Sequence, residues 1–301
     1  MAKNLIVILG PTASGKTHLA AKLAYDLHGE IISADSRQVY KNMDIGTGKD
    51  LNQYIINGRR IPYHLIDIVA PENEFNLFEF QYRFYKIFNE LIEKKILPVL
   101  VGGTGLYLES VLTGYNMPHA PMNQELRKGL YRKSKDELQK MLLALKPQLH
   151  NKTDLEDSER LIRAIEIERA RSIKDQPQKP DIDAVVFGIR WERSTLRQRI
   201  TARLKERLEQ GMIEEVMKLH TAGLTWTKLE SFGLEYRFIS QYLQRKISFD
   251  EMTNKLNTAI HQFAKRQETW FRRMEKKGIV INWLQSNDYS LLKESVMKFL
   301  Q

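Results

Sequence analysis

The chain has 301 residues, of which 42% are hydrophobic and 28% are charged, and it contains no cysteine. This composition is typical of a folded globular protein. The absence of cysteine excludes disulfide bonds and removes the thiolate ligands that most structural zinc sites use. No apolar run is long enough to cross a membrane, and no secretory cleavage pattern follows the first apolar run, Leu5 to Gly10. We therefore expect a cytoplasmic protein without membrane contact.

The charge balance is basic: 47 Lys and Arg stand against 37 Asp and Glu, which gives a formal net charge of +10. A surplus of this size is typical of proteins with a polyanionic partner, but a basic enzyme without such a partner explains it equally well. Charge alone does not choose between the two.

The first third of the chain alternates short β-rich runs with amphipathic helical stretches, which predicts an α/β fold with a parallel sheet core. Helices are expected to start near Lys16, Leu77 and Gly105. The predicted strands are 4–9, 30–33, 63–69, 97–101 and, much later, 184–189.

The gap between the last two predicted strands is too long for an ordinary connection. It has helical spacing at Leu138, Met141, Leu142 and Leu145, and it ends in a polar, proline-containing segment, 175–181, that should form a loop. We interpret 115–183 as an inserted helical subdomain, and 1–114 with 184–301 as the core with its C-terminal helices.

From Ser194 onward the pattern is helical nearly to the end, and one helix face carries an apolar row. The row consists of Leu196, Ile200, Leu204 and Leu208. Two stretches of this region, 190–210 and 265–277, are strongly basic; a solvated helix face would explain either one taken alone.

The segment Gly10-Pro-Thr-Ala-Ser-Gly-Lys-Thr17 matches G-x-x-x-x-G-K-[ST] between a predicted strand and a predicted helix. In such a P-loop, backbone amides and the helix amino end surround a phosphate. Lys16 would bind bridging oxygens, and the Thr17 hydroxyl would ligate Mg²⁺. The pattern predicts a di- or triphosphate site without identifying the compound, and the same motif is the ATP-binding motif of nucleotide-binding proteins. The predicted pyrophosphate ligands are Gly10, Pro11, Thr12, Ala13, Ser14, Gly15, Lys16 and Thr17.

P-loop ATPases usually carry an acidic residue at the end of a neighbouring strand. Here the most hydrophobic later strand ends in Gly102-Gly103-Thr104-Gly105, and the acid follows the second strand instead, as Asp35. Asp35 could cap a turn. Because the carboxyl ends of parallel strands face the ligand crevice, we expect Asp35 across from the P-loop, where a general base would be wanted.

Three other features favour structural roles. Ile45-Gly-Thr-Gly-Lys49 could be a flexible surface turn, and Asp67 a loop cap rather than a Mg²⁺ ligand. The aromatic residues between Phe75 and Phe88 are expected to form a buried helix face. The seven histidines show no metal-ligand spacing.

Taken together, motifs spread over the chain resemble those of the tRNA dimethylallyltransferases, also called tRNA isopentenyltransferases. The matching segments are Gly10-Pro-Thr-Ala-Ser-Gly-Lys-Thr17, Asp35-Ser36 with Tyr40, Met43-Asp-Ile-Gly-Thr47 with Lys49, Leu100-Val-Gly-Gly-Thr104 with Leu106-Tyr107, Arg160-Leu161 with Arg163-Ala164, Arg199-Ile200 with Arg203, Tyr236-Arg237, and Lys265-Arg-Gln267 with Thr269-Trp270.

The resemblance implies that the P-loop holds dimethylallyl pyrophosphate with Mg²⁺. The dimethylallyl group would pass to the N6 amine of the adenosine 3′ to the anticodon, in tRNAs that read codons beginning with U. It makes Asp35 the residue that takes the amine proton, with Thr104 and Arg127 as candidates for contacts in the reaction channel. The implied partner is the anticodon stem-loop, gripped on one side by the inserted subdomain, and we expect a monomer. The implied tRNA contacts are Asp35, Ser36, Arg37, Gln38, Thr104, Arg127, Glu159, Arg160, Leu161, Ile162, Arg163, Phe232, Tyr236 and Arg237.

The chain departs from the family pattern where an Arg and a Gly commonly precede the Tyr, because it has Phe232 and Glu235 there. Glu156-Asp-Ser-Glu159 likewise replaces the usual Asn-Asp-x-Arg-type signature, and the cysteine–histidine zinc extension is missing. Two other functions use some of the same features. A small-molecule or nucleotide kinase would leave the basic surplus and the acid-free turn at Gly102-Gly103-Thr104 without purpose. An RNA-binding protein without chemistry would leave Asp35 without a purpose.

Overall fold

The structure is a computed structural model that describes residues 3–117, 120, 122–146, 157–170 and 179–300. The chain divides into two compact units. The sheet unit comprises residues 1–114 and 180–301, and the helical unit comprises 115–179.

The sheet unit is built on six parallel strands in the order β5-β2-β6-β1-β7-β8, which confirms the predicted α/β class. The strands are β1 (Leu5–Leu9), β2 (Glu30–Ala34), β5 (Tyr63–His64), β6 (Pro98–Gly102), β7 (Ala184–Arg190) and β8 (Asn282–Gln285). The register pairs Leu9 with Gly102 and Gly102 with Ala34. Three strands therefore end level with one another, and the loops that follow them leave the sheet side by side.

The strands differ from the prediction in three places. The run 63–69 was expected to be one strand, but β5 ends at His64 because Leu65 and Asp67 take left-handed backbone angles, with φ of 63° and 56°. Strand β8 was missed, since the helical pattern was extended nearly to the end of the chain. The short hairpin of β3 (Ile55–Ile56) and β4 (Arg59–Arg60), which follows the 3-10 helix η1 (Leu51–Tyr54), was also missed, because two-residue strands show no alternation.

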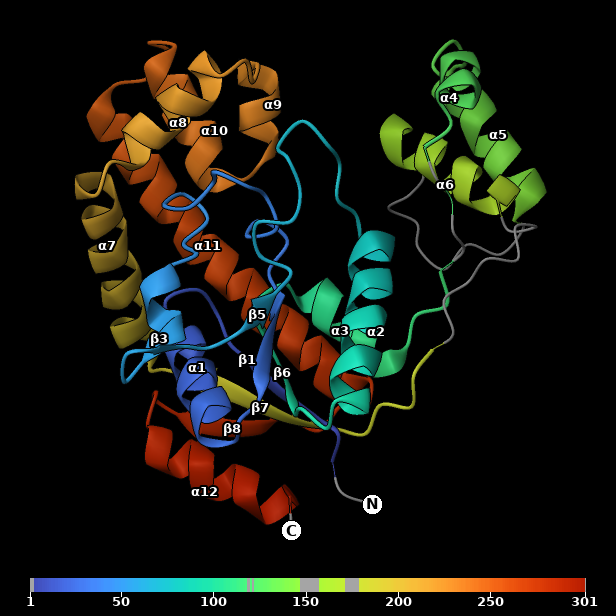
Figure 1. The fold of residues 1–301 in the computed structure, drawn as a ribbon. Coiled ribbons are helices and arrows are strands. Elements are labelled where there is room, and N and C mark those ends of the chain that lie inside the picture. Colours follow the sequence, from blue (N-terminus) through green and yellow to red (C-terminus); the bar gives the residue numbers. More distant parts are fainter. Residues whose placement is uncertain (1–2, 118–119, 121, 147–156, 171–178, 301) are drawn as a thin grey trace. The chain divides into compact units, whose positions relative to one another are not determined.

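Helices cover both faces of the sheet (Figure 1). Leu5, Val7 and Leu9 of β1 pack in a cluster with α2 (Leu77–Glu93), α3 (Gly105–Thr113) and α11 (Phe249–Lys276). Ile6 and Ile8 pack on the other side with α1 (Lys16–Asp26) and α12 (Tyr289–Leu300). A strand buried on both faces reads as an unbroken apolar run, which is why β1 was predicted correctly. As expected, the aromatic run of α2 is mainly core: Phe80, Phe84, Tyr85 and Phe88 are buried.

A third cluster joins α11 to α7 (Arg193–Glu209), α8 (Met212–Thr221), α9 (Trp226–Ser231) and α10 (Leu234–Leu243). The predicted apolar row of α7 is confirmed for Leu196, Ile200 and Leu204, which are buried, while Leu208 is partly buried. A capping box of Ser248 and Glu251 starts α11.

The helical unit contains α4 (Gln124–Leu130), α5 (Lys135–Leu145) and α6 (Ser158–Ala170), and α5 carries the predicted helical spacing. Its core consists of Leu130, Leu138, Leu142, Leu161, Ile162 and Ile165. In the predicted loop 175–181, residues 175–178 lie outside the described part of the chain, and 179–181 form neither helix nor strand. Asp181 and Asp183, predicted as the end of the insertion, bond to Asn4 and belong with the sheet unit.

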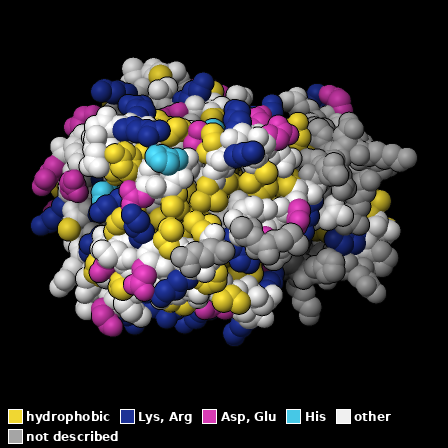
Figure 2. Space-filling model, turned by 60° about the horizontal axis from the view of Figure 1, so that its bottom comes forward, with side chains coloured by type: hydrophobic (Ala, Val, Ile, Leu, Met, Phe, Trp, Pro, Cys, Tyr) yellow, Lys and Arg dark blue, Asp and Glu magenta, His cyan; other side chains and the backbone are white. Residues whose placement is uncertain are grey.

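Basic side chains are distributed over the face of the molecule that Figure 2 shows. Among the described residues visible there, Lys and Arg side chains are interspersed with acidic and hydrophobic ones rather than gathered in one patch. None of the described helices has both the length and the apolar composition needed to span a membrane.

Candidate active site

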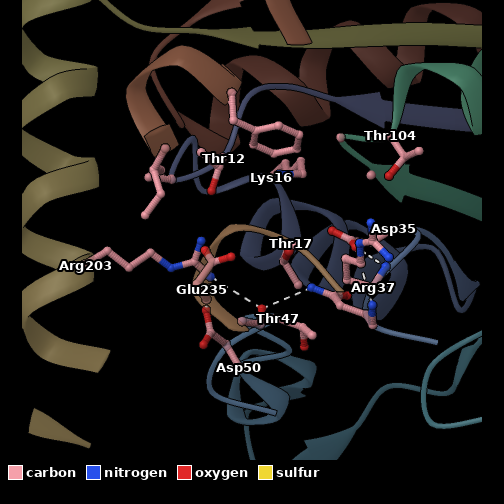
Figure 3. Close-up of a pocket in the computed structure, with 18 of the residues that line it drawn as sticks. Thr12, Lys16, Thr17, Asp35, Arg37, Thr47, Asp50, Thr104, Arg203 and Glu235 are labelled. Atoms are coloured by element: carbon pink, nitrogen blue, oxygen red, sulfur yellow. Dashed lines mark hydrogen bonds and ion pairs between the residues drawn. The ribbon is translucent and has the colours of Figure 1, made fainter. Parts of the chain in front are cut away.

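The carboxyl ends of the strands open into a pocket of about 1090 Å³, lined by residues of the sheet unit (Figure 3). Its floor is formed by the loops after β1, β2 and β6, namely 10–17, 35–38 and 102–105, which we call the strand-end floor. One side is formed by Arg199, Arg203 and Arg207 of α7, which we call the α7 wall. The loop 46–50 and parts of α10 and α11 complete the lining.

The 10–17 loop has the tight geometry that its sequence predicts. Ala13 and Gly15 have positive φ of 61° and 87°. A Cβ at Gly10 would lie 2.8 Å from Ser14 Oγ, so only glycine fits there. Thr12, Ala13, Gly15, Lys16 and Thr17 line the pocket. Gly10, Pro11 and Ser14 are buried and do not line it, so they can shape the loop but do not present side chains to a ligand.

Lys16 extends from the start of α1, and its Nζ donates a hydrogen bond to the Pro11 carbonyl at 3.2 Å. Burial lowers the pKa of Lys16 from 10.5 to about 8. Asp35 opposes this shift, whereas Arg203 and Arg207 add to it. The strand-end floor and the α7 wall are therefore close enough to influence each other's charge.

Asp35 caps a turn and also lines the pocket, so both placements weighed for it from the sequence are present together. Its Oδ1 accepts a hydrogen bond from the Arg37 amide at 2.9 Å, so it caps the turn after β2, and it also lines the pocket. Thr104 lies beside this turn, and its Oγ1 accepts a hydrogen bond from the Ser36 amide at 3.1 Å. In Figure 3, Asp35 and Thr104 lie on one side of Lys16 and Thr17, and Arg203 lies on the other.

The acid-free turn after β6 also borders the pocket, because its glycines allow close approach of three segments. A Cβ at Gly102 would lie 2.2 Å from the Ala34 carbonyl oxygen. Gln267 of α11 donates from Nε2 to the Gly103 carbonyl at 2.9 Å and accepts from the Thr12 amide at 2.8 Å. One amide side chain thus ties the turn to the 10–17 loop.

The expectation of a flexible surface turn at 45–49 is wrong. Gly46, Thr47 and Gly48 line the pocket, and the Lys49 side chain is buried, with its Nζ donating to the Tyr40 carbonyl and to Asp44 at 2.7 Å each, and to Asp67. The pair with Lys49 agrees with the structural role preferred for Asp67.

Glu215 of α8 holds the same loop from outside. Its carboxylate accepts the backbone N–H groups of Asp44, Ile45 and Gly46 at 2.7–3.0 Å, together with the Tyr236 hydroxyl at 2.7 Å. No local motif announces this contact, because donors and acceptor are about 170 residues apart in the chain.

The α7 wall was not proposed as a site from the sequence. Arg199 Nε donates to the Ala13 carbonyl at 2.9 Å. Arg203 Nη2 donates to the Gly48 carbonyl at 3.4 Å and pairs with Asp50. The arginines recur every four residues, and each directly precedes a member of the apolar row of the same helix. This periodicity, which places them on one side of α7, was the available sequence signal for a basic wall.

Several predicted tRNA contacts in the sheet unit are buried. Gln38, Phe232 and Tyr236 are 9%, 2% and 1% exposed, so they pack within the protein although they border the pocket. Ser36 and Arg37 line the pocket, with Arg37 exposed, and Arg237 is exposed on α10.

In the helical unit, Arg127 binds Glu166 through two hydrogen bonds, at 2.8 and 2.9 Å, and Arg163 adds a third at 3.1 Å. Burial raises the pKa of Glu166, but these donors outweigh it and leave that pKa below its usual value. Of the remaining predicted contacts, Glu159 and Arg160 are exposed, whereas the side chains of Leu161 and Ile162 lie in the core of the unit and are not available to RNA.

Within the described residues, no group of three or more His, Asp or Glu side chains could hold a metal ion by itself. Thr17, which carries a hydroxyl, does line the pocket next to Lys16. This donor set fits a Mg²⁺ ion that takes most of its ligands from substrate phosphates and water, not a resident metal centre.

Known proteins match this arrangement over nearly the whole chain. The family model described as IPP transferase matches residues 38–274. The chain is 56% identical over 299 residues to a tRNA dimethylallyltransferase 1 of Syntrophus aciditrophicus, covering 98% of both chains. It is 54% identical to the corresponding protein of Geotalea uraniireducens, covering 98% of this chain and 96% of that one.

Solved structures agree in fold. The tRNA isopentenylpyrophosphate transferase of Bacillus halodurans superposes with a TM-score of 0.70 at 30% identity, covering 99% of this chain and 97% of that chain. A eukaryotic dimethylallyltransferase acting on tRNA superposes with a TM-score of 0.75 at 23% identity, covering 96% and 75%. The chain therefore belongs to the IPP transferase family of tRNA dimethylallyltransferases, enzymes that transfer a prenyl group to tRNA.

Proposed function

We propose that the enzyme transfers a dimethylallyl group from dimethylallyl pyrophosphate to the N6 amine of the adenosine 3′ to the anticodon, in tRNAs that read codons beginning with U. The observation that carries the proposal is that Lys16, Thr17 and Asp35 line one pocket. A site for a diphosphate and a carboxylate that can accept a proton thus share one space.

The diphosphate end of the substrate fits the 10–17 loop. Thr12, Ala13 and Gly15 of this loop line the pocket next to the first residues of α1, and Lys16 adds a cation. Bound Mg²⁺, held by Thr17 and the phosphates, would supply further positive charge to the leaving group. These groups stabilise the charge that the pyrophosphate gains as it departs.

The reaction breaks the bond between the allylic carbon and the pyrophosphate oxygen, and forms a bond from that carbon to N6. The amine loses one proton, which we assign to the Asp35 carboxylate. Pyrophosphate leaves with both electrons of the broken bond, so atoms and charge balance without an oxidant or a second cofactor.

The adenosine must leave the anticodon-loop stack to reach the pocket, which costs little in a single-stranded loop. Thr104, Ser36 and Arg37 border the pocket next to Asp35 and are placed to contact the base or its backbone. We keep Arg127, Glu159, Arg160 and Arg163 of the helical unit as tRNA contacts, and the protein as a cytoplasmic monomer.

The test is incubation of the enzyme and Mg²⁺ with dimethylallyl pyrophosphate labelled in the allyl group and with unmodified tRNA. We expect label on N6 of the adenosine 3′ to the anticodon and one pyrophosphate released per label transferred. Label on another nucleotide would overturn the position, and transfer of a phosphoryl group from ATP to a metabolite without prenyl transfer would favour a kinase.

A further inference from the structure

Arg207 of the α7 wall is a buried cation, two of whose nitrogens are unpartnered among the described residues. Arg207 is 8% exposed, and its Nε and Nη2 atoms have no hydrogen-bond partner within the described residues. Because an unpaired guanidinium loses hydration on burial, this arrangement costs stability unless a further group satisfies it.

The position of Arg207 is set by Gly48. A Cβ on Gly48 would lie 1.4 Å from Arg207 Nη2 and 2.8 Å from Arg203 Nη2, so two guanidinium groups crowd over one glycine. Arg203 is paired with Asp50, which leaves the charge of Arg207 as the uncompensated member of the pair. The loop 46–48 therefore lines the pocket and also leaves space for the Arg207 guanidinium, because Gly48 has no side chain.

Two carboxylates act on the charge of Arg207. Asp50 is already paired with Arg203, and Glu235 lines the pocket beside Arg207. Burial lowers the pKa of Arg207 and raises that of Glu235, and each residue partly opposes the shift of the other. No ion pair within 4.0 Å joins them among the described residues. A hollow of about 10 Å³ between Thr12, Arg203, Arg207 and Glu235 has room for a single water. A water in this hollow would link the pair, and Arg207 also lines the large pocket.

The charges around this point fit a multiply charged anion. Both arginines lower the pKa of Lys16, so three cations from two elements act on one region of the pocket. A diphosphate held by Lys16 would give Arg207 the acceptor that it lacks, because guanidinium groups bind phosphate oxygens through two parallel hydrogen bonds.

We propose that Arg207 is a further ligand of the diphosphate, binding a phosphate oxygen alongside Lys16, and that Glu235 is a positioning residue that holds the guanidinium in place before the substrate arrives. This proposal rests on the proposed function, because it takes the diphosphate of dimethylallyl pyrophosphate as the ligand. It also gives a role to Glu235, which departs from the family pattern.

The decisive measurement is calorimetric titration of the enzyme with inorganic pyrophosphate and Mg²⁺. Arg207→Met should raise the Kd by about 10- to 100-fold, the usual effect of losing a charge-assisted hydrogen bond. Arg207→Lys should recover part of the affinity. The matched control is Arg197→Met on the exposed face of α7, which should leave the Kd unchanged. A Kd for Arg207→Met equal to that of the wild type would overturn the proposal.

Thermal unfolding without ligand separates a binding role from a structural one. If Arg207 awaits an anion, Arg207→Met should have a Tm equal to or above that of the wild type, because an unsatisfied buried charge has been removed. If Arg207 instead stabilises the fold through a water to Glu235, the variant should have a lower Tm with an unchanged Kd, and the proposal fails.

Gly48→Ala provides an independent variant that keeps every charge. Its methyl group displaces the guanidinium, so pyrophosphate affinity should fall, and adding Gly48→Ala to Arg207→Met should cause little further loss. Additive losses would mean that the two residues act separately, contrary to the proposal.

An RNA phosphate is the other possible source of the anion. Arg207→Met should leave the affinity for tRNA and its salt dependence unchanged; a salt slope reduced by about 1, with pyrophosphate affinity intact, would assign the residue to RNA and overturn our proposal. Failure of the wild-type enzyme to bind pyrophosphate would refute the proposed function itself, whereas equal binding by wild type and variant would refute only this inference.

Discussion

The strand-end floor and the α7 wall place charge in the same pocket by different means. The floor uses backbone, because the level ends of β1, β2 and β6 bring three glycine-containing or turn-forming loops together. The α7 wall uses long side chains from one helix, held by packing of Leu196, Ile200 and Leu204 beneath them. A Cβ cannot be added to the floor at Gly10 or Gly102 without collision.

The largest effect should come from the floor residue assigned to proton transfer. Asp35→Asn keeps the oxygen that caps the turn at the Arg37 amide but cannot accept a proton, so kcat should fall by about 10²- to 10⁴-fold. Single-turnover measurement of prenyl transfer tests this, with the Kd for pyrophosphate expected to stay near the wild-type value.

Asp35→Ala serves as the comparison, since it loses both the base and the cap. It should match Asp35→Asn in chemical rate and be less stable by about 1 kcal/mol. Turnover by Asp35→Asn at the wild-type rate would remove Asp35 from the mechanism.

The difference between floor and wall also explains what could be predicted from sequence. The 10–17 loop, Asp35 and the turn at 102–105 were placed correctly in one pocket, because each follows an apolar strand whose end fixes its position. The arginines of α7 reach the pocket because the apolar row of their helix packs against other elements, so their periodicity alone did not show whether they line a pocket or face solvent.

Contacts between distant segments could not be predicted either, because they also depend on tertiary packing. Glu215 and Gln267 reach loops far away in the chain, and neither lies in a pattern that names its partner. The left-handed residues Leu65 and Asp67 likewise ended β5 early, although the apolar pattern continued. Tertiary packing, not local preference, decides such positions.

The loop that joins floor to wall should depend strongly on Glu215. Glu215→Ala leaves three backbone N–H groups and the Tyr236 hydroxyl without their acceptor, and the free energy of unfolding should fall by about 3 kcal/mol. Urea denaturation measures the change.

Glu214→Ala is the matched control. Glu214 is an exposed neighbour in the same first turn of α8, and its substitution removes the same charge. It should change stability by less than about 0.5 kcal/mol. Equal losses in the two variants would show that charge at the helix start, and not the loop contact, is responsible.

A smaller effect is expected where α11 supports the floor. Gln267→Ala removes the hydrogen bonds to the Gly103 carbonyl and from the Thr12 amide, and should lower the free energy of unfolding by about 2 kcal/mol. Because Thr12 belongs to the 10–17 loop, pyrophosphate affinity should also decrease. Gln262→Ala, an exposed glutamine of the same helix, should leave both quantities unchanged.

The smallest expected effect is on the pH dependence of pyrophosphate affinity, to which the floor and the wall should contribute differently. Burial lowers the pKa of Lys16 to about 8 in the unliganded protein, so below pH 8 its ammonium is charged, and above pH 8 it loses the proton that an anion requires. Since a bound anion raises this pKa again, pyrophosphate affinity should decrease by up to tenfold per pH unit as the pH rises from 8 to 9. The guanidinium groups of the α7 wall keep their charge over this range and add no pH dependence to the affinity.

Lys16→Met should therefore bind pyrophosphate more weakly and retain only the pH dependence of pyrophosphate itself. If wild type and variant change in parallel between pH 8 and 9, the ammonium of Lys16 is not the titrating group, and the contrast in charge chemistry between floor and wall does not hold.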